Sequence, residues 1–209
     1  MARIFAALVV LAAVLALPAG APAIAEETAG GMAGAVATRP AIGRLNHAGY
    51  SRRRHCTMVA VAPETVLTAS HCLEGLPASA FHLLFGYARM TWQAERTATA
   101  AHPVAGDLSA LCLAEPVATA RAIGPPPAVG DAVVWVGYGR PRVHLQEART
   151  CIVARRGGGE IALDCPAPRG ASGGPVLDGA GRVVAILSRT GRSTSIATLV
   201  PADVAERCH

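Results

Sequence analysis

The stretch Gly170–Pro175 places one serine, Ser172, among glycines and ahead of the apolar run Pro175–Leu177. Glycine permits positive φ and close approach of the backbone, so a serine in this setting can be held at a tight, open turn. Backbone N–H groups on either side of the serine can then face the developing oxyanion of a ligand. The same residues also suit a polar hairpin turn between two strands. Which of the two applies depends on whether the chain supplies a base for the serine.

A serine hydroxyl is a weak nucleophile, which needs a neighbouring imidazole to take its proton and an acid to orient that imidazole. Among the 7 histidines, His71 has the most informative surroundings, because it follows the run Val66–Ala69 and precedes Cys72. A disulfide at Cys72 would hold such a base against a rigid wall, and a plausible strand upstream begins with Cys56. The alternative is a histidine at the end of a strand that merely caps a turn.

The composition favours a globular protein and gives little support to nucleic-acid binding. Apolar residues make up 52% of the 209 residues, enough for a hydrophobic core. The net charge of +5 comes from scattered arginines, and Arg52–Arg54 is their one cluster. No nucleic-acid-binding motif accompanies this charge, so we expect no nucleic-acid partner.

The 6 cysteines are an even number, which in an exported chain is consistent with disulfides throughout. No pair of them has the close spacing of zinc ligands, so we expect neither a metal ion nor another cofactor.

The N-terminus is typical of a secretory signal peptide. A basic residue, Arg3, precedes the apolar run Ile4–Leu17, and Ala23–Ala25 offers small residues before Glu26. We therefore predict a signal peptide over residues 1–25, a flexible leader over 26–40, and secretion to the periplasm or the extracellular medium. A retained membrane anchor is the alternative, but the apolar run is shorter than the roughly 20 residues that a membrane span needs.

Short apolar or alternating runs recur from Ala41 onward, separated by Gly, Pro, Asn and Asp, and this pattern favours an all-β barrel or sandwich. The proline-rich stretch 121–129 predicts an extended linker between two halves, about 41–120 and about 130–209. Pro201–Arg207 predicts a short C-terminal helix that opens with proline. The predicted strands are Thr57–Ala62, Thr65–Thr68, Phe81–Phe85, Leu108–Leu113, Ala132–Gly137, Thr150–Ala154, Glu160–Leu163, Gly174–Leu177, Arg182–Ser188 and Thr194–Leu199.

Three segments together resemble the trypsin-like, chymotrypsin-fold serine peptidases of the bacterial secreted type. Cys56–Cys72 resembles their histidine segment, Gly106–Leu111 their aspartate segment, and Gly170–Pro175 their serine segment. Gly137–Gly139 also resembles the family's Gly-Trp-Gly element. The likeness covers nearly all of the chain after residue 40, and it implies two six-stranded antiparallel β-barrels with a short C-terminal helix.

The resemblance implies a catalytic triad of His71, Asp107 and Ser172, in the chain order of the chymotrypsin family. Asp131 also lies between a glycine and a strand, but Asp107 has the better context and the right order. The backbone N–H groups of Gly170 and Ser172 would form the oxyanion hole, and the physics agrees, since a glycine amide can turn toward a bound carbonyl.

The resemblance also implies a disulfide between Cys56 and Cys72. We then favour Cys151–Cys165, because the glycine turn of a predicted hairpin lies between these two cysteines. Cys112–Cys208 follows by elimination only.

One departure from the family concerns activation. The residue before the serine is Ala171, where the pancreatic-type enzymes have an aspartate that receives a new N-terminal amine. Ala171 cannot form that ion pair, so we predict that cleavage after Arg39 does not switch the protein on through a buried N-terminus.

The specificity pocket is a second departure. Pro166 stands where trypsin-type enzymes have aspartate, and Leu187 where glutamate-specific relatives have histidine. We therefore expect a small or medium apolar side chain at the cleaved bond, with Pro166 lining the pocket. Ser188, Arg189 and Thr190 would bind the substrate backbone as an added strand.

The leading hypothesis is a secreted, monomeric serine endopeptidase that acts on protein or peptide substrates without a stable membrane anchor. Two alternatives stay open, a non-catalytic binding module on the same fold and an esterase that uses the same triad.

Overall fold

The computed structural model describes residues 39–47 and 55–208, and within these ranges the chain is almost entirely β-structure. The all-β, chymotrypsin-like fold class predicted from the sequence is confirmed. The predicted signal peptide, most of the leader and the Arg52–Arg54 cluster lie outside the described residues. No helix within the described residues has the length and apolar character needed to cross a bilayer.

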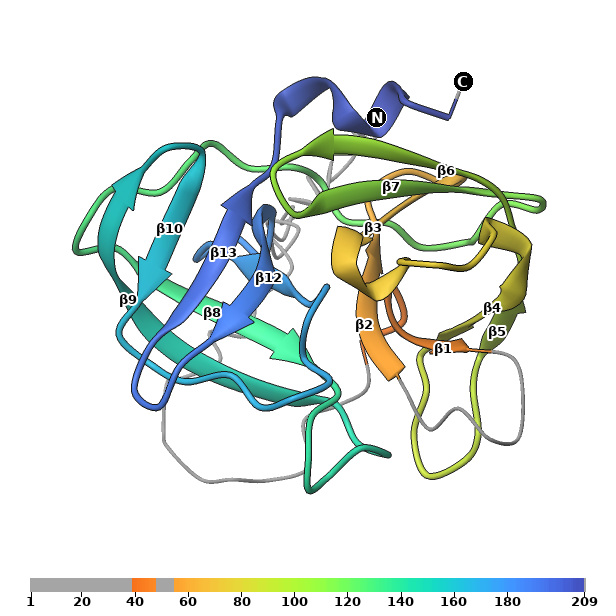
Figure 1. The fold of residues 1–209 in the computed structure, drawn as a ribbon, viewed down its shortest axis with the longest axis horizontal. Coiled ribbons are helices and arrows are strands. Elements are labelled where there is room, and N and C mark those ends of the chain that lie inside the picture. The colour runs from red at the N-terminus through yellow and green to blue at the C-terminus, as the bar shows by residue number, and fades with distance from the viewer. Residues whose placement is uncertain (1–38, 48–54, 209) are drawn as a thin grey trace, which may run out of the picture. The chain divides into compact units, whose positions relative to one another are not determined.

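The N-terminal half forms a seven-stranded antiparallel sheet in the order β5-β4-β1-β2-β3-β7-β6 (Figure 1). The central strand β3 is fully buried, whereas the edge strand β5 has only 3 residues and the edge strand β6 is largely exposed, as expected for edges that face solvent. The strands are β1 (Ile42–His47), β2 (His55–Ala60), β3 (Thr65–Ala69), β4 (Phe81–Phe85), β5 (Ala94–Arg96), β6 (Ala98–Ala105) and β7 (Leu108–Leu113).

The C-terminal half is a closed six-stranded barrel in the order β10-β13-β12-β11-β8-β9 (Figure 1). Along β9 the inward residues Cys151 and Val153 alternate with exposed ones, the period-2 pattern of a strand with one buried face. The strands are β8 (Ala132–Gly137), β9 (Glu147–Gly157), β10 (Glu160–Leu163), β11 (Pro175–Leu177), β12 (Val183–Thr190) and β13 (Ser195–Leu199).

The two halves share an apolar cluster. Ile42, Leu67 and Leu108 from the first sheet pack with Val136 and Ile186 from the barrel, and all five side chains are fully buried. This common core holds the end of β3 beside the barrel, where the candidate site lies.

All three predicted disulfides form, namely Cys56–Cys72, Cys112–Cys208 and Cys151–Cys165. The predicted C-terminal helix is a 3-10 helix, η3 (Ala202–Glu206), and the disulfide from Cys112 in β7 to Cys208 ties the segment after it to the first sheet. Two further 3-10 turns are η1 (Ser70–Cys72) and η2 (Ala78–Ala80).

The first half differs from the expected six-stranded barrel in its number of strands. Three of its strands, β1, β5 and β6, were not among the runs predicted from the sequence. The strand β5 is only 3 residues long, and β6 carries Pro103 and is largely exposed, so neither has the apolar alternation that marks a strand in a sequence.

Candidate active site

His71 and Asp107 meet because β3 and β7 are antiparallel neighbours. The register pairs Ala69 at the end of β3 with Leu108 at the start of β7. The residues just beyond these ends therefore lie side by side, and the Ser70 N–H donates to the Asp107 carbonyl at 3.1 Å. The Asp107 carboxylate accepts two hydrogen bonds from His71, from its backbone N–H at 2.9 Å and from Nδ1 at 2.7 Å.

Ser188 brings a third group to the same carboxylate. Its hydroxyl donates to Oδ2 of Asp107 at 2.5 Å, although the two residues belong to different halves of the fold. The β12–β13 register shifts between Leu187 and Arg189, so Ser188 is the extra residue of a β-bulge. A bulge re-aims a side chain, which explains why the consecutive residues Leu187 and Ser188 are both buried.

The environment keeps Asp107 ionised. Burial of the carboxyl acts to raise its pKa, but the hydrogen bonds from Ser188 and from His71 outweigh this effect, so the pKa of Asp107 lies below its usual value. An ionised carboxylate can only accept hydrogen bonds, so Nδ1 of His71 carries a proton, and in the neutral ring the lone pair is then on Nε2.

The loop that carries Ser172 is fixed between the two halves. The Thr57 N–H in β2 donates to the Ser172 carbonyl at 2.8 Å, and the Gly173 N–H donates to Leu187 O in β12 at 2.8 Å. Gly173 has φ +81° and touches the first sheet so closely that an added β-carbon would lie 2.1 Å from Thr57 O and 3.1 Å from Ala69 N. Ser172 therefore directly precedes a glycine whose backbone lies against β3, at the residue two positions before His71.

The backbone N–H groups of this loop fall into two kinds. Those of Ala171, Gly173 and Gly174 donate to carbonyls within the protein, at 3.0, 2.8 and 2.8 Å. Within the described part of the chain, the N–H groups of Gly170 and Ser172 have no protein acceptor. These two are the groups that the sequence assigned to an oxyanion hole.

The remaining predicted contact is not formed in this structure. Nε2 of His71 lies 3.8 Å from Sγ of Cys72, and among the described residues no hydrogen bond joins it to the Ser172 hydroxyl. His71 is 38% exposed at its side chain, so the ring is reachable from solvent.

The residues predicted to bind substrate come from two segments, the end of β12 and the segment around Pro166, which are joined by a hydrogen bond. The Thr190 hydroxyl accepts from the Ala167 N–H at 3.1 Å, which joins the end of β12 to the segment that contains Pro166. Arg189 points its guanidinium at Glu160, with two contacts of 2.8 and 2.9 Å, so its charge is neutralised. The Ser188 hydroxyl donates to Asp107, which leaves only the Ser188 backbone to pair with a substrate strand.

The family model of the trypsin-like peptidase domain matches residues 56–186, more than half of the chain, and the match includes His71, Asp107 and Ser172. The chain belongs to the trypsin-like peptidase family. Its sequence matches none of the curated proteins.

Solved structures of serine proteases are similar to this trypsin-like domain in fold. The thermostable serine protease AL20 from an extremophilic microorganism is 18% identical with a TM-score of 0.67, and the match covers 81% of this chain and 94% of that one. A Glu endopeptidase is 16% identical, with a TM-score of 0.69 and coverage of 80% and 87%. A scabies mite inactivated protease paralogue is 15% identical, with a TM-score of 0.69 and coverage of 85% and 96%. At identities this low, the similarity to these structures shows the fold alone.

Sequence reasoning missed the residues that support the Ser172 loop of this trypsin-like domain. Tyr138 in the Gly-Tyr-Gly element is fully buried, and both its backbone polar groups are bound by β2. Its N–H donates to Oγ1 of Thr57 at 2.9 Å, and its carbonyl accepts from Nε2 of His55 at 3.1 Å. His55 and Thr57 are two residues apart, so their side chains share one face of β2. This period-2 spacing was the signal in the sequence that the two side chains could bind the same neighbour.

The Tyr138 phenol is anchored at its far end as well. It donates to Tyr87 O at 2.7 Å and accepts from the Gln146 amide at 2.9 Å. Burial raises the pKa of Tyr138 well above its usual value, although the Gln146 hydrogen bond acts against this shift. The tyrosine therefore stays a neutral structural support beside the loop.

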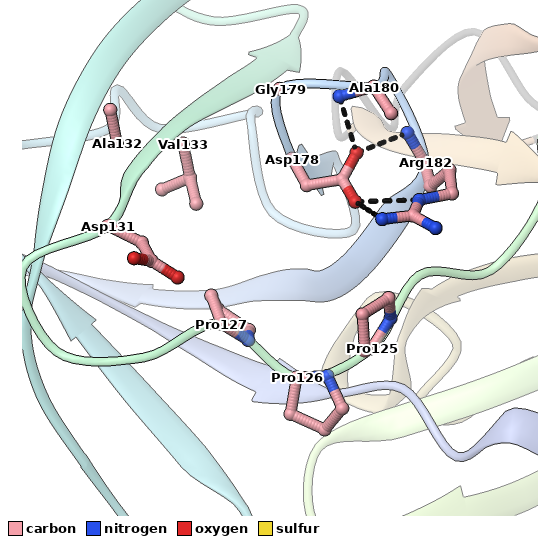
Figure 2. A pocket seen from close by; sticks show the side chains of 10 residues that line it. All are labelled: Pro125, Pro126, Pro127, Asp131, Ala132, Val133, Asp178, Gly179, Ala180 and Arg182. Atoms are coloured by element: carbon pink, nitrogen blue, oxygen red, sulfur yellow. Dashed lines mark hydrogen bonds and ion pairs between the residues drawn. The ribbon is translucent and has the colours of Figure 1, made fainter.

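Two other features of the peptidase domain contribute nothing to this site. The hollow in Figure 2, lined by Pro125–Pro127 and Asp131, contains no candidate catalytic residue, and its Asp178 carboxylate is already paired with Arg182 at 2.8 Å. The grouping of His71 with Cys56 and Cys72 has the proximity of metal ligands, but both sulfurs are bonded in a disulfide.

Proposed function

We propose that this chain is an exported serine endopeptidase that hydrolyses peptide bonds through His71, Asp107 and Ser172. The observation that carries the proposal is the pair of unpartnered N–H groups at Gly170 and Ser172, within a loop whose other three N–H groups are satisfied. Buried backbone donors are nearly always paired. Gly170 and Ser172 are half-buried, and their two N–H groups on either side of the loop, without a protein acceptor among the described residues, support a site for an external acceptor.

In the proposed reaction the Ser172 hydroxyl attacks the scissile carbonyl carbon while Nε2 of His71 takes the hydroxyl proton. The carbonyl oxygen becomes an oxyanion that accepts hydrogen bonds from Gly170 and Ser172. The C–N bond then breaks, His71 returns the proton to the leaving amine, and an ester on Ser172 remains. Water attacks this ester with His71 again as the base, which releases the carboxylic acid and restores the serine.

Asp107 supports both steps without changing its own protonation state. Its carboxylate fixes the Nδ1–H tautomer and stabilises the imidazolium that forms after proton transfer. The proposal requires the Ser172 hydroxyl to reach Nε2 when substrate binds, and such contacts are commonly long in enzymes without substrate.

For the cleaved bond we propose a small or medium apolar residue on the acyl side. Support comes from the neutral Pro166 and Ala167 and from the pairing of Arg189 with Glu160, since no unpaired charge remains among these residues for Arg, Lys or Glu. The disulfides and the predicted signal peptide support export. We expect the protein to act as a monomer.

The binding-module alternative has one observation in its favour, the missing hydrogen bond between Ser172 and His71. Labelling with a fluorophosphonate separates the two functions, because an activated serine attacks the phosphorus of the reagent, displaces fluoride and becomes phosphonylated. We expect the mature wild type to label and Ser172→Ala to stay unlabelled. An unlabelled wild type would favour the binding module, and labelled protein that cleaves esters but no peptide in a diverse library would favour an esterase.

A further inference from the structure

The Gly170 peptide has two neighbours that fix its orientation, one on each side. On the upstream side, the Arg169 carbonyl accepts from the Arg140 N–H at 3.0 Å. On the downstream side, the Gly170 carbonyl accepts from the Thr57 hydroxyl at 2.9 Å. In a trans peptide the C=O and N–H point in opposite directions, so the Arg140 contact turns the Gly170 N–H away from Arg140, and none of the residues in 39–47 and 55–208 accepts a hydrogen bond from it.

Gly170 lies between these two anchors in a conformation that only glycine adopts with ease. Its φ is +101°, and an added β-carbon would lie 2.4 Å from Nε2 of His55. Glycine has more conformational freedom than any other residue, so the orientation of the peptide groups on its two sides depends on the hydrogen bonds to the Arg169 carbonyl and to the Gly170 carbonyl. Among the described residues, Thr57 supplies the one side-chain hydrogen bond to the Gly170 carbonyl.

The Thr57 hydroxyl has no freedom to point elsewhere. It is fully buried, and its oxygen already accepts from the Tyr138 N–H at 2.9 Å, so its own proton is directed at Gly170 O. Tyr138 is in turn held through its carbonyl and its phenol. The hydroxyl is therefore a fixed donor on a rigid frame.

Thr57 binds both halves of the proposed oxyanion hole. Its backbone N–H donates to Ser172 O, and its hydroxyl donates to Gly170 O. The backbone bond survives any substitution except proline, whereas the hydroxyl bond needs threonine or serine. The two contributions can thus be separated by mutation.

We propose that Thr57 is a positioning residue, whose hydroxyl holds the Gly170 peptide so that its N–H faces the transition-state oxyanion. This inference rests on the proposed peptidase function. Ala171 is buried among apolar side chains and offers no carboxylate to order the loop, and the hydroxyl supplies the fixed contact from a neighbouring strand instead.

The test compares Thr57→Val, Thr57→Ala and Thr57→Ser in the full mature protein. Val and Ala remove the hydroxyl, and we expect kcat to fall about tenfold to a hundredfold with KM nearly unchanged, somewhat less than the roughly 10²–10³-fold loss when an oxyanion donor is removed outright. Ser restores the donor and should stay within about threefold of wild type. A peptide aldehyde, which forms a tetrahedral oxyanion on the serine, should lose affinity in parallel with kcat rather than with KM.

Thr65→Val is the matched control. Thr65 is also a fully buried threonine whose hydroxyl donates to a backbone carbonyl, Ala205 O at 2.9 Å, but it does not contact the Ser172 loop. We expect it to lower the melting temperature as Thr57→Val does, while kcat and aldehyde affinity stay at wild-type values.

Three outcomes overturn the inference. The first is a folded Thr57→Val or Thr57→Ala protein with wild-type kcat. The second is a Thr57 variant that loses as much affinity for the substrate as for the aldehyde. The third is a loss of kcat in Thr65→Val as large as the loss in Thr57→Val. A wild type that neither cleaves peptides nor labels with fluorophosphonate overturns the proposed function as well, so the two failures are distinguishable.

Discussion

Ser188 donates its hydroxyl to the Asp107 carboxylate at 2.5 Å, across the junction between the C-terminal barrel and the N-terminal sheet. The contact depends on the β-bulge that turns Ser188 inward. Because the donor lies in one half and the acceptor in the other, the acid of the candidate triad is oriented by the packing of the two halves as well as by His71.

We predict that Ser188→Ala lowers kcat about three- to tenfold, because the carboxylate loses one of its hydrogen bonds and holds His71 less firmly. The variant also changes the pH dependence of stability. The pKa of Asp107 is depressed in the folded protein, so its stabilising contribution is present above the unfolded pKa and is lost as pH falls through the folded value. Thermal unfolding at neutral and acid pH should therefore show a larger destabilisation by Ser188→Ala at neutral pH.

Ser195→Ala is the control for this prediction. Ser195 is buried and donates to a neutral acceptor, Cys165 O, at 2.9 Å. Its substitution should cost the same stability at both pH values. Equal pH profiles for the two variants would contradict the role given to Ser188.

We predict that Gly170→Ala reduces the rate of fluorophosphonate labelling at least a hundredfold, about the loss expected when an oxyanion donor is displaced. The added methyl group would lie 2.7 Å from Tyr138 O, and the φ of +101° is unfavourable for alanine. Gly158→Ala is the control, since Gly158 also has positive φ, at +59°, but has no atom within 4 Å of the added carbon. It should lose a little stability and no activity. Equal labelling of both variants would exclude a shaped loop at Gly170.

His55 gives a prediction about stability in mild acid. Burial, aided by the nearby Arg44, lowers the pKa of His55 from 6.5 to about 4. The unfolded chain therefore binds more protons than the folded one between these values, and stability falls as pH drops through that window and levels off below it. Urea unfolding of wild type should show this loss, and His55→Gln, which keeps a donor for Tyr138 O, should reduce it.

His102→Gln provides the comparison for His55, because His102 is exposed on β6. Its substitution should leave the pH dependence of unfolding as in wild type. A slope that is the same in wild type and His55→Gln would show that His55 is not the group responsible.

Local motifs carried most of the catalytic prediction. His71, Asp107 and Ser172 each lie within a short segment whose own residues mark it, and the β3–β7 register brings the first two together. The roles of Ser188 and Thr57 could not be predicted in the same way, because each acts on a residue more than 80 positions away, Asp107 for Ser188 and Gly170 for Thr57. Such contacts depend on how the two halves pack. The sequence around Ser188 or Thr57 does not indicate which residue of the other half each one will contact.

The fold was predictable to a similar degree. Apolar runs such as Leu108–Leu113 marked the buried strands, but the edge strand β5 is short and the edge strand β6 is largely exposed and contains Pro103, so neither has such a run. The closing of the barrel around β8–β13 follows from pairing between distant strands, β10 with β13 for example, which alternation along the chain does not encode.

The last prediction concerns activation. Ala171 is fully buried within an apolar cluster that includes Cys151, Val176 and Leu187, so an N-terminal ammonium placed there would be a buried charge without a partner. Residue 39 is instead held by the side chain of Gln146, because its backbone N–H donates to Oε1 of that side chain at 2.9 Å. We therefore expect proteins that begin at residue 34, 39 or 41 to have kcat/KM values within about twofold of one another, since no new terminus orders the Ser172 loop. Active-site titration with a fluorophosphonate would correct each value for the folded fraction. A large gain in kcat/KM when the chain begins at one particular residue would show that a new N-terminus does order the loop, and would place the switch somewhere other than Ala171.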